Sequence, residues 1–448
     1  MLRRCSPPLH IREQRPYAAV ALLQQGSLRP PSPCPKEAGP APGRPAAGPS
    51  AGAFEGMPCG HYREDMRGGR VTLFLCGDVM LGRGVDQILA CPGDPALREG
   101  WIRDARAYVD LAEAVNGPIP APVPPEWPWG EALRVLAKAA ADVRIVNLET
   151  SVTCADAFAP GKEVHYRMHP ANVSALAVAR PDVCVLANNH TLDFGRAGLV
   201  ETLGTLSGAG LRAAGAGRNA EEAYAPVVCP VADGVRVLVV ARGMASSGIP
   251  PSWAATAKRP GVAYVPEPTA AAAAEIVERV RRIRRPGDLV VVSVHWGSNW
   301  GYHVPREQVR FARALVDGGV DVVHGHSSHH PRPVEVHRDR LILYGCGDFI
   351  DDYEGVSGYE EYRDDLRVAY FPSLEAGTGR PAQVRMVVLR ARRMRLEPAS
   401  EEDRAWMRAT LDRISPGTGI TAGPGGVLGA AGTTGAVREP NGTSFPTF

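Results

Sequence analysis

The sequence predicts an α/β fold, and three observations support this. Short apolar runs alternate along the chain with amphipathic segments of helical period. Such alternation is typical of a mostly parallel sheet with helices on its faces. Toward the C-terminus, strand-like runs follow one another with few helices between them, which predicts a second sheet or an antiparallel extension. With 448 residues, 44% of them hydrophobic, the chain can bury a sizeable core.

The individual elements follow from these patterns. Six apolar runs are predicted to be buried strands, at residues 71–76, 143–149, 183–187, 235–241, 289–295 and 320–325. Four amphipathic segments are predicted to be helices, at residues 131–143, 198–210, 271–283 and 307–319. Consecutive strands are expected at residues 333–338, 340–345 and 382–397. The proline-rich stretch 116–130 predicts a loop or lid.

The two ends of the chain differ from its middle in composition. Residues 1–69 are rich in Pro, Gly and Ala, which predicts a disordered segment. Because ordered patterning begins only near Val71, Met57 or Met66 is an alternative translation start. One domain is expected over residues 70–414. The Gly/Thr/Pro-rich residues 415–448 are predicted to be a flexible tail.

Charge and composition narrow the function classes. The net charge of +2 favours neither nucleic acid nor an acidic membrane surface as a partner, and the basic run 279–285 is interpreted as a solvated helix face. No apolar stretch approaches the roughly 18 residues of a membrane span, so the protein is predicted to be cytoplasmic. Nine scattered cysteines without a CxxC pair predict neither a zinc ribbon nor a disulfide framework. No Walker A loop or dinucleotide fingerprint is present, which argues against ATP-driven ligation.

The C-terminal ends of the predicted strands carry the informative residues. Five of them change abruptly from apolar residues to metal-ligand types: Asp78, Asn147, Glu149, Asn188, Asn189, His190, Asp193, His295, His324, His326, His329 and His330. Strand ends of an open α/β sheet surround one crevice, so distant residues can converge there. Imidazoles combined with Asp, Glu and Asn oxygens are ligands for Zn, Mn or Fe. The sequence therefore predicts a polynuclear metal site.

Each of these residues also has an ordinary structural explanation. Asp78 can be a loop aspartate, Glu149 a helix or turn cap, and His295 a satisfied core histidine. Asn188, Asn189 and Asp193 suit turn chemistry without binding any metal. Four histidines within residues 324–330, beside an apolar strand, are costly unless they are coordinated or exposed. Together, the five strand ends favour the metal site.

Six motifs occur in series, namely GDVMLGR, NLETSVT, ANNHTLDFG, HWG, GHSSHHP and YGCGDF. In this series the chain resembles the CapA family of poly-γ-glutamate capsule synthesis, which is similar to calcineurin-like metallophosphoesterases. The resemblance covers about Val71 to Tyr353. It implies a metallophosphatase-like layered sandwich, with two central sheets flanked by helices. It also implies a metal-dependent hydrolase of a phosphoester or γ-glutamyl amide. The alternative is a non-catalytic accessory protein that keeps its metals and binds an anionic polymer.

The resemblance also implies roles for single residues. The implied metal ligands are Asp78, Glu149, Asn189, His190, His295, His326 and His329. Glu149 would be shared by two divalent ions (Mn, Zn or Fe), with a bridging water as nucleophile. The implied catalytic residues are Asn189, His190 and His329, and His190 or a histidine of residues 326–330 would protonate the leaving group. Arg83 suits the anionic group of a substrate, although a surface salt bridge explains it nearly as well.

Two positions depart from the family pattern. Asn299 follows HWGS where relatives often have Glu, and Asp348 stands in GCGDF where relatives often have Asn. If both touch the site, the preference for substrate charge differs from that of relatives. Asp348 can orient one ligand without contacting a metal. Four tryptophans are candidates either to wall the site or to pack in the core: Trp127, Trp129, Trp296 and Trp300.

Overall fold

The computed structural model describes residues 69–423 and 427–430. The predicted N-terminal segment, except for Gly69, lies outside the described residues, as does the question of the translation start. The same holds for most of the predicted C-terminal tail. In the part of the chain that is described, no helix combines the length and the apolar character that crossing a membrane requires.

The first sheet has ten strands, which are parallel on one side and antiparallel on the other. Strand β1 (Arg70–Val79) lies at its centre and pairs in parallel with β2 (Val143–Leu148) and β16 (Asp348–Ile350). On one side the sheet continues in parallel through β5 (Val183–Val185) and β6 (Ala213–Ala214). On the other side it continues antiparallel through β17 (Leu366–Glu375), β18 (Pro381–Ala391), β19 (Leu396–Pro398), β20 (Ile420–Ala422) and β21 (Leu428–Ala430).

The second sheet has seven strands and is also parallel in its middle. Its central strands are β9 (Arg236–Met244), β12 (Leu289–His295) and β13 (Val322–His326). Around them lie β8 (Val227–Pro230), β11 (Tyr264–Val265), β14 (Val334–His337) and β15 (Arg340–Leu343). Two further pairs of short strands stand apart, β3 (Ser151–Val152) with β4 (Arg167–Met168), and β7 (Ala216–Gly217) with β10 (Gly261–Val262).

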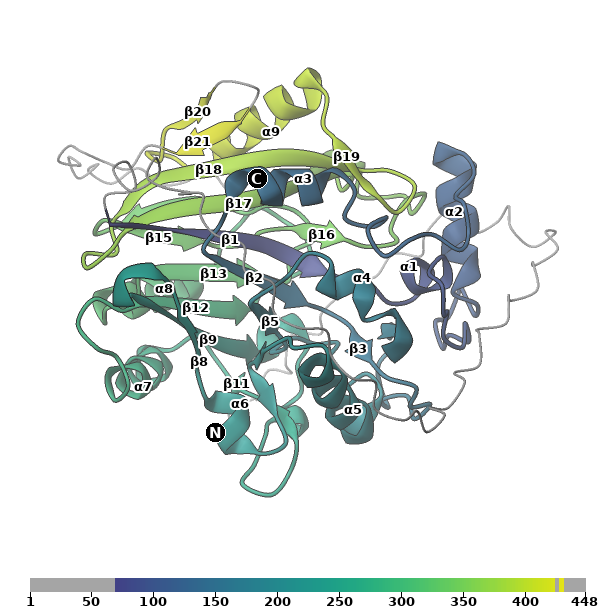
Figure 1. Cartoon of the computed structure of the whole chain (residues 1–448), viewed down its shortest axis with the longest axis horizontal. Helices are drawn as coiled ribbons and strands as arrows, with labels where there is room; N and C mark the ends of the chain where they lie inside the picture. The colour runs from purple at the N-terminus through teal and green to yellow at the C-terminus, as the bar shows by residue number, and fades with distance from the viewer. Residues whose placement is uncertain (1–68, 424–426, 431–448) are drawn as a thin grey trace, which may run out of the picture.

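Helices cover the outer face of each sheet. On the first sheet lie α1 (Gly84–Gln87), α2 (Arg106–Asn116), α3 (Glu131–Ala139), α4 (Ser174–Ala177) and α5 (Gly195–Gly208). On the second lie α7 (Ala270–Arg281) and α8 (Arg306–Asp317). The other two are α6 (Ala220–Tyr224), against β7 and β10, and α9 (Glu401–Ile414), against β18 and β20. Figure 1 shows α7 and α8 on one side of the strands, and α1 and α2 at the other end of the molecule.

A separate apolar core joins the two sheets face to face. Leu73 and Leu75 of β1 pack there with Val239 of β9 and Val291 of β12, and all four are fully buried. The order of layers is therefore helices, sheet, sheet, helices. This confirms the predicted fold class, an α/β layered sandwich with two central sheets flanked by helices.

Several elements of this sandwich were not predicted, and three of them have ten residues or more. The sequence analysis did not identify α2, α9 or the long strand β17, which pairs with β1. The flexible tail was also placed too early. Residues 420–422 and 428–430 form β20 and β21, and β21 extends the sheet beside β18. Their glycine-rich surroundings hide the strand signal, because glycine is typical of loops.

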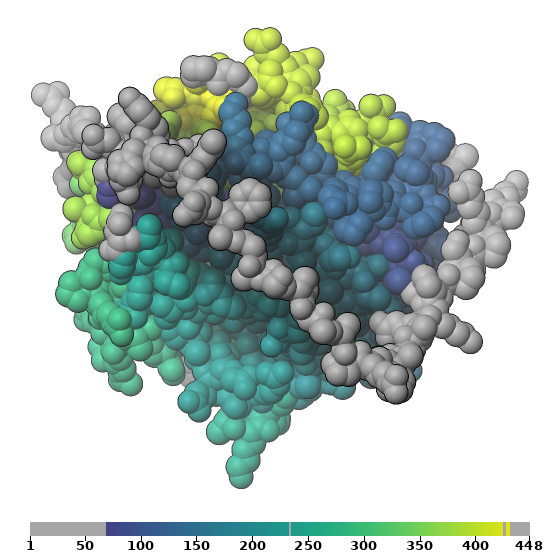
Figure 2. All heavy atoms as spheres, in the orientation of Figure 1, coloured from purple at the N-terminus to yellow at the C-terminus, as the bar shows by residue number. Residues whose placement is uncertain are grey.

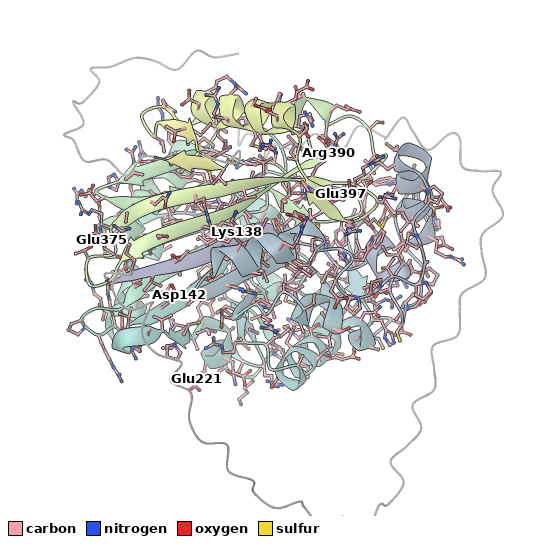
Figure 3. All side chains as sticks on the ribbon, turned by 45° about the horizontal axis from the view of Figure 1, so that its top comes forward. Lys138, Asp142, Glu221, Glu375, Arg390 and Glu397 are labelled. Carbon is pink, nitrogen blue, oxygen red and sulfur yellow. The ribbon has the colours of Figure 1, made fainter. Side chains whose placement is uncertain are left out.

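The surface shows how segments distant in sequence meet. Figure 2 shows α2 and α3, in blue, beside the yellow-green C-terminal elements, and α3 packs against β19. In Figure 3, Lys138 and Glu221 lie on the outside of the fold, and Arg390 lies near Glu397, its register partner across β18 and β19.

Candidate metal centre

The inner faces of both sheets change from apolar to polar at their C-terminal ends. In β2, Val143 and Ile145 face the inter-sheet core, and the same alternation carries Asn147 inward. Because side chains alternate along a strand with a period of two, His295 of β12 likewise follows Leu289 and Val291 onto the inner face. The polar ends of the two sheets therefore face each other, and the predicted convergence of strand ends is present.

Asp78 reaches the inner face by a local irregularity of β1. The register between β1 and β2 shifts between Leu75 and Asp78, and a shift of this kind re-aims the side chains beyond it. Gly77 is required at this bend, because a Cβ there would lie 1.5 Å from the carbonyl oxygen of Gly347. The backbone N–H of Asp78 donates to that same oxygen at 3.0 Å. The close approach of β16 thus holds Asp78 in place.

Asp78 and Glu149 form the anionic half of the site. Asn147 Nδ2 donates to Asp78 Oδ1 at 2.7 Å and to Glu149 Oε2 at 3.3 Å. Burial, and then the charge of Asp348, raises the pKa of Asp78 to about 7. Burial and the charge of Asp78 raise the pKa of Glu149 well above its ordinary value. Two buried carboxyl groups side by side favour a proton or a cation between them.

His295 and His326 form the imidazole half. They are register partners at the ends of β12 and β13, and their Nδ1 atoms lie 2.7 Å apart. Burial lowers the pKa of both rings well below the ordinary value, so both are neutral, as metal ligands must be. The hydroxyl of Ser293 lies 2.8 Å from His326 Nε2 and holds the ring in orientation.

Glu149 and Asn189 connect the two halves. Glu149 Oε1 lies 3.7 Å from His190 Nε2 and 3.8 Å from His295 Nε2. The side-chain oxygen of Asn189 lies 2.8 Å from His295 Nε2. Behind them, the amide of Asn188 donates to the carbonyl of Leu148 at 2.8 Å. Asn188 therefore supports the turn and does not offer a donor atom to the centre.

His190 is held by two groups that carry opposite charges. Its Nδ1 lies 2.6 Å from Asp193 Oδ2 and 3.0 Å from Lys162 Nζ. Lys162 also donates to the backbone oxygen of Asn189 and to Asp193 Oδ1. Asp193 is thus part of the site, although its sequence position suits a turn equally well. Lys162 was not predicted to lie here, because it belongs to an irregular segment before β4 that carries no periodic or motif signal.

His329 lies beside Asp348. Its Nδ1 is 2.9 Å from Asp348 Oδ1. Burial on its own would lower the pKa of His329, but the charge and hydrogen bond of Asp348 raise it above the ordinary value. From the sequence, Asp348 is a departure from the family pattern that can orient one ligand, and the contact with His329 agrees with that expectation.

Two sets of three donors can each hold a cation. One consists of Asp78, His295 and His326, and the other of Asp78, His329 and Asp348. Within each set the donor atoms lie within 4.8 Å of one another and all residues are buried. Asp78 belongs to both sets. In the first set a carboxyl group with a raised pKa faces two neutral imidazoles, and in the second two buried carboxyl groups lie beside one imidazole, so each set fits a divalent metal ion.

The remaining histidines of residues 324–330 have other surroundings. His324 Nε2 lies 2.8 Å from the carbonyl oxygen of Cys76, and its Nδ1 lies 3.1 Å from the Ser293 hydroxyl, so it is a satisfied core histidine. His330 is buried and stacks on Tyr362 at 4.4 Å between ring centroids. Neither belongs to the two donor sets.

Arg83 does not join these donors. Its Nη1 donates to Glu99 Oε1 at 2.8 Å, and its Nε and Nη2 donate to Asp352 at 2.8 and 2.5 Å. The guanidinium also lies 3.6 Å from the ring centroid of Tyr108. Arg83 therefore forms salt bridges, as the alternative explanation holds, but these are buried and not at the surface. Substrate binding by Arg83 stays a prediction, and it would require these ion pairs to open.

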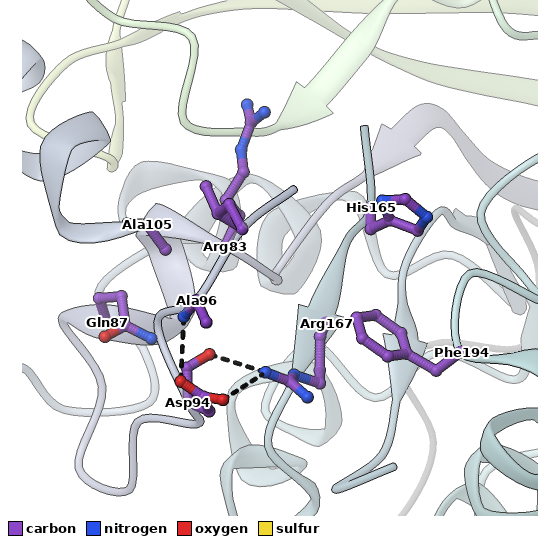
Figure 4. A pocket seen from close by; sticks show the side chains of 9 residues that line it. Arg83, Gln87, Asp94, Ala96, Ala105, His165, Arg167 and Phe194 are labelled. Carbon is purple, nitrogen blue, oxygen red and sulfur yellow. Dashed lines mark hydrogen bonds and ion pairs between the residues drawn. The ribbon is translucent and has the colours of Figure 1, made fainter. Parts of the chain in front are cut away.

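A small cavity lies beside Arg83. It is lined by Arg83, Gln87, Asp94, Ala96, Leu97, Ala105, His165, Arg167 and Phe194 (Figure 4). Its volume of about 10 Å³ is that of one water molecule, too small for a substrate. In Figure 4 the guanidinium of Arg83 points away from Asp94 and Arg167, and none of the candidate metal ligands lines the cavity.

Trp300 has its ring beside a histidine of the site. Its ring centroid lies 5.4 Å from that of His329. Trp129 and Trp296 are fully buried in the outer cores, and Trp127 is partly buried against the core of the first sheet. The packing alternative therefore holds for these three. Asn299 contributes a backbone oxygen, which accepts from the N–H of His329 at 2.9 Å.

The chain has clear relatives. Residues 72–353 match the family model described as bacterial capsule synthesis protein PGA_cap. A probable polyglutamine synthesis accessory protein of Mycobacterium tuberculosis (strain ATCC 25618 / H37Rv) is 52% identical over 351 residues, which are 78% of this chain and 92% of the relative. The PGA biosynthesis protein CapA of Bacillus subtilis (strain 168) is 29% identical over 243 residues, covering 54% of this chain and 60% of that protein.

Among solved structures, a 5'-nucleotidase precursor from Thermus thermophilus is similar, with a TM-score of 0.41 and 14% identity. The match covers 77% of this chain and 58% of that one. This likeness is too weak to support an argument about fold or activity.

Proposed function

We propose that this chain, which belongs to the bacterial capsule synthesis protein PGA_cap family, is a metal-dependent hydrolase. The observation that carries the proposal is the pair of donor sets that share Asp78 across the two sheets. One or two divalent ions (Mn, Zn or Fe) are the cofactors of this proposal. The substrate is a phosphoester or a γ-glutamyl amide within the synthesis of poly-γ-glutamate, and the location is cytoplasmic.

In such a site the bound cations and the residues of the chain would contribute different parts of the chemistry. Divalent cations, when bound, make a water nucleophilic at neutral pH and polarise a phosphoryl or carbonyl oxygen. The chain holds Asn189 and His190 beside Glu149, where a substrate oxygen would lie. Asp193 and Lys162 fix the His190 ring, so that its Nε2 faces the site. Burial lowers the pKa of His190 to about 4, so the neutral ring would first take up a proton at Nε2 and then give it to a leaving group.

A second function has one observation in its favour. The relative from Mycobacterium tuberculosis is named an accessory protein. In that case the metal ions would bind an anionic polymer, such as poly-γ-glutamate, without turnover. The same donor sets serve both functions, because carboxylate and phosphate oxygens are both ligands for hard cations.

A panel of substrates distinguishes the two functions. The purified protein is incubated with p-nitrophenyl phosphate, bis-p-nitrophenyl phosphate and poly-γ-glutamate, each with Mn²⁺, with Zn²⁺ or with EDTA. The hydrolase proposal predicts turnover of at least one substrate that EDTA abolishes. Metal-dependent binding of poly-γ-glutamate with no turnover of any substrate would support the accessory function instead.

A further inference from the structure

Asp348 lies directly opposite Asp78 in the first sheet, although the two residues are far apart in the sequence. It begins β16, and the parallel register between β16 and β1 makes Asp348 and Asp78 direct partners. Both side chains are buried, with exposures of 1% and 0%. Like charges directly opposite each other on neighbouring strands destabilise a sheet. A cation between the two carboxylates removes this repulsion.

One oxygen of Asp348 has no partner. Oδ1 lies 2.9 Å from His329 Nδ1, whereas Oδ2 is fully buried and has no hydrogen-bond partner among the described residues. Leaving a buried charged oxygen unpaired is costly, and native structures rarely keep one without a role. The orphaned oxygen belongs to a residue whose donor atoms lie within 4.8 Å of those of Asp78 and His329.

The nearby cations do not supply the missing partner. Arg367 lies close enough to Asp348 for their charges to interact, but its Nη2 donates to Asp351 Oδ2 at 2.6 Å. Its Nη1 donates to backbone carbonyl oxygens. In the described part of the chain, no lysine or arginine forms an ion pair with Asp348.

From this geometry we propose that Asp348 is itself a metal ligand and that it holds one divalent cation together with Asp78 and His329. The proposal rests on the proposed function in one respect, because both use the donor set of Asp78, His329 and Asp348. Two carboxylates and one imidazole make an oxygen-rich set, which suits a hard cation such as Mn²⁺. The set of Asp78, His295 and His326 is richer in nitrogen and suits Zn²⁺ or iron better.

The rival explanation is that Asp348 only orients His329 through the 2.9 Å contact. The substitution Asp348→Asn separates the two, because asparagine keeps an oxygen that can accept from His329 Nδ1 but loses the negative charge. Asp351→Asn is the matched control. It removes a buried carboxylate three residues away that pairs with Arg367 and lies outside both donor sets.

The test titrates metal-free protein with Mn²⁺ by calorimetry, without any substrate. Relative to wild type, Asp348→Asn is expected to bind about one ion fewer per chain. If the ion still binds, its affinity should be lowered more than about 100-fold, which is more than an orienting residue contributes. Asp351→Asn is expected to keep the wild-type stoichiometry. Unchanged Mn²⁺ binding in Asp348→Asn overturns the proposal.

Crystals of the wild-type protein grown with Mn²⁺ give a second test that does not depend on a variant. The anomalous difference map should place a manganese peak at about 2.0–2.3 Å from an oxygen of Asp348. A peak bound by His329 but more than about 3 Å from both Asp348 oxygens overturns the proposal. A peak at Asp348 in a protein without any turnover contradicts the hydrolase but upholds the ligand.

Discussion

The two sheets bring chemically opposite halves to the same site. The first sheet contributes the buried carboxyl groups of Asp78, Glu149 and Asp348, which crowd one another. The second contributes the neutral imidazoles of His295 and His326, whose pKa values burial lowers. Neither half is a complete cation site, because one is short of neutral donors and the other of negative charge. The centre therefore exists only through the packing of one sheet on the other.

The largest effect is expected for Asp78→Ala, because Asp78 belongs to both donor sets. Metal content should fall to near zero. Affinity should drop by more than the about 10- to 100-fold typical of residues that only support a ligand. Elemental analysis of the purified variant measures this, with circular dichroism to show that the fold is kept. A variant with full metal content would remove Asp78 from the site.

A smaller loss of metal is expected for His326→Ala, because this substitution removes a donor from the imidazole half only. It should lower the metal content by about one ion and leave the set of Asp78, His329 and Asp348 intact. The control is His324→Ala, two residues earlier on the same inner face. It should cost about 1–3 kcal/mol of stability through its lost hydrogen bonds but keep the metal content. Equal metal loss in both variants would contradict the assignment.

Lys162→Met tests the positioning of His190 without removing a proposed metal ligand. Lys162 contacts the backbone oxygen of Asn189 and the ring of His190, so its loss should loosen the histidine proposed to be catalytic while the metal content stays near wild type. We expect kcat to fall about 10- to 100-fold with little change in KM. The activity is measured with any substrate that the protein turns over in the panel described above. Unchanged kcat would show that Lys162 has no part in positioning His190.

The smallest effect concerns pH. In the metal-free protein the pKa of Asp78 is raised to about 7, from about 3.9 in an unfolded chain. The folded state therefore holds an extra proton between these values. The stability from that proton is fully present below about pH 4 and is lost as the pH rises through 7.

The measurement is thermal unfolding of metal-free protein at about pH 5.5 and pH 8, with and without Mn²⁺. Because the cation takes the place of the proton, Mn²⁺ should raise Tm more at pH 8 than at pH 5.5. Asp78→Ala should show no such difference. An equal rise at both pH values in the wild type would contradict the anionic half as described.

Much of this arrangement follows from period-two patterning in the sequence. In β2 and β12 the apolar inner positions continue directly into Asn147 and His295, so the convergence of these residues was predictable. The placement of Asp78 on the inner face depends on the irregularity at Gly77, which the pattern of β1 does not reveal. The contact between Asp78 and Asp348 depends on the pairing of two strands far apart in sequence.

The missed elements have similar causes. The strand β17 lies between stretches of mixed polarity, and its position beside β1 is set by a long-range antiparallel pairing. Lys162 lies in an irregular segment, where neither periodicity nor turn chemistry indicates a contact with His190. Arg83 has the right chemistry for an anion, but its partners Glu99 and Asp352 become visible only once the chain is folded.

The most direct test is the metal content of wild-type protein purified without added metal, measured by elemental analysis. Two sets of donors that share Asp78 predict about two divalent ions per chain, lost on dialysis against chelator and regained on adding Mn²⁺ or Zn²⁺. A folded protein that carries no metal, and takes up none when Mn²⁺, Zn²⁺ or Fe²⁺ is added, would contradict the account.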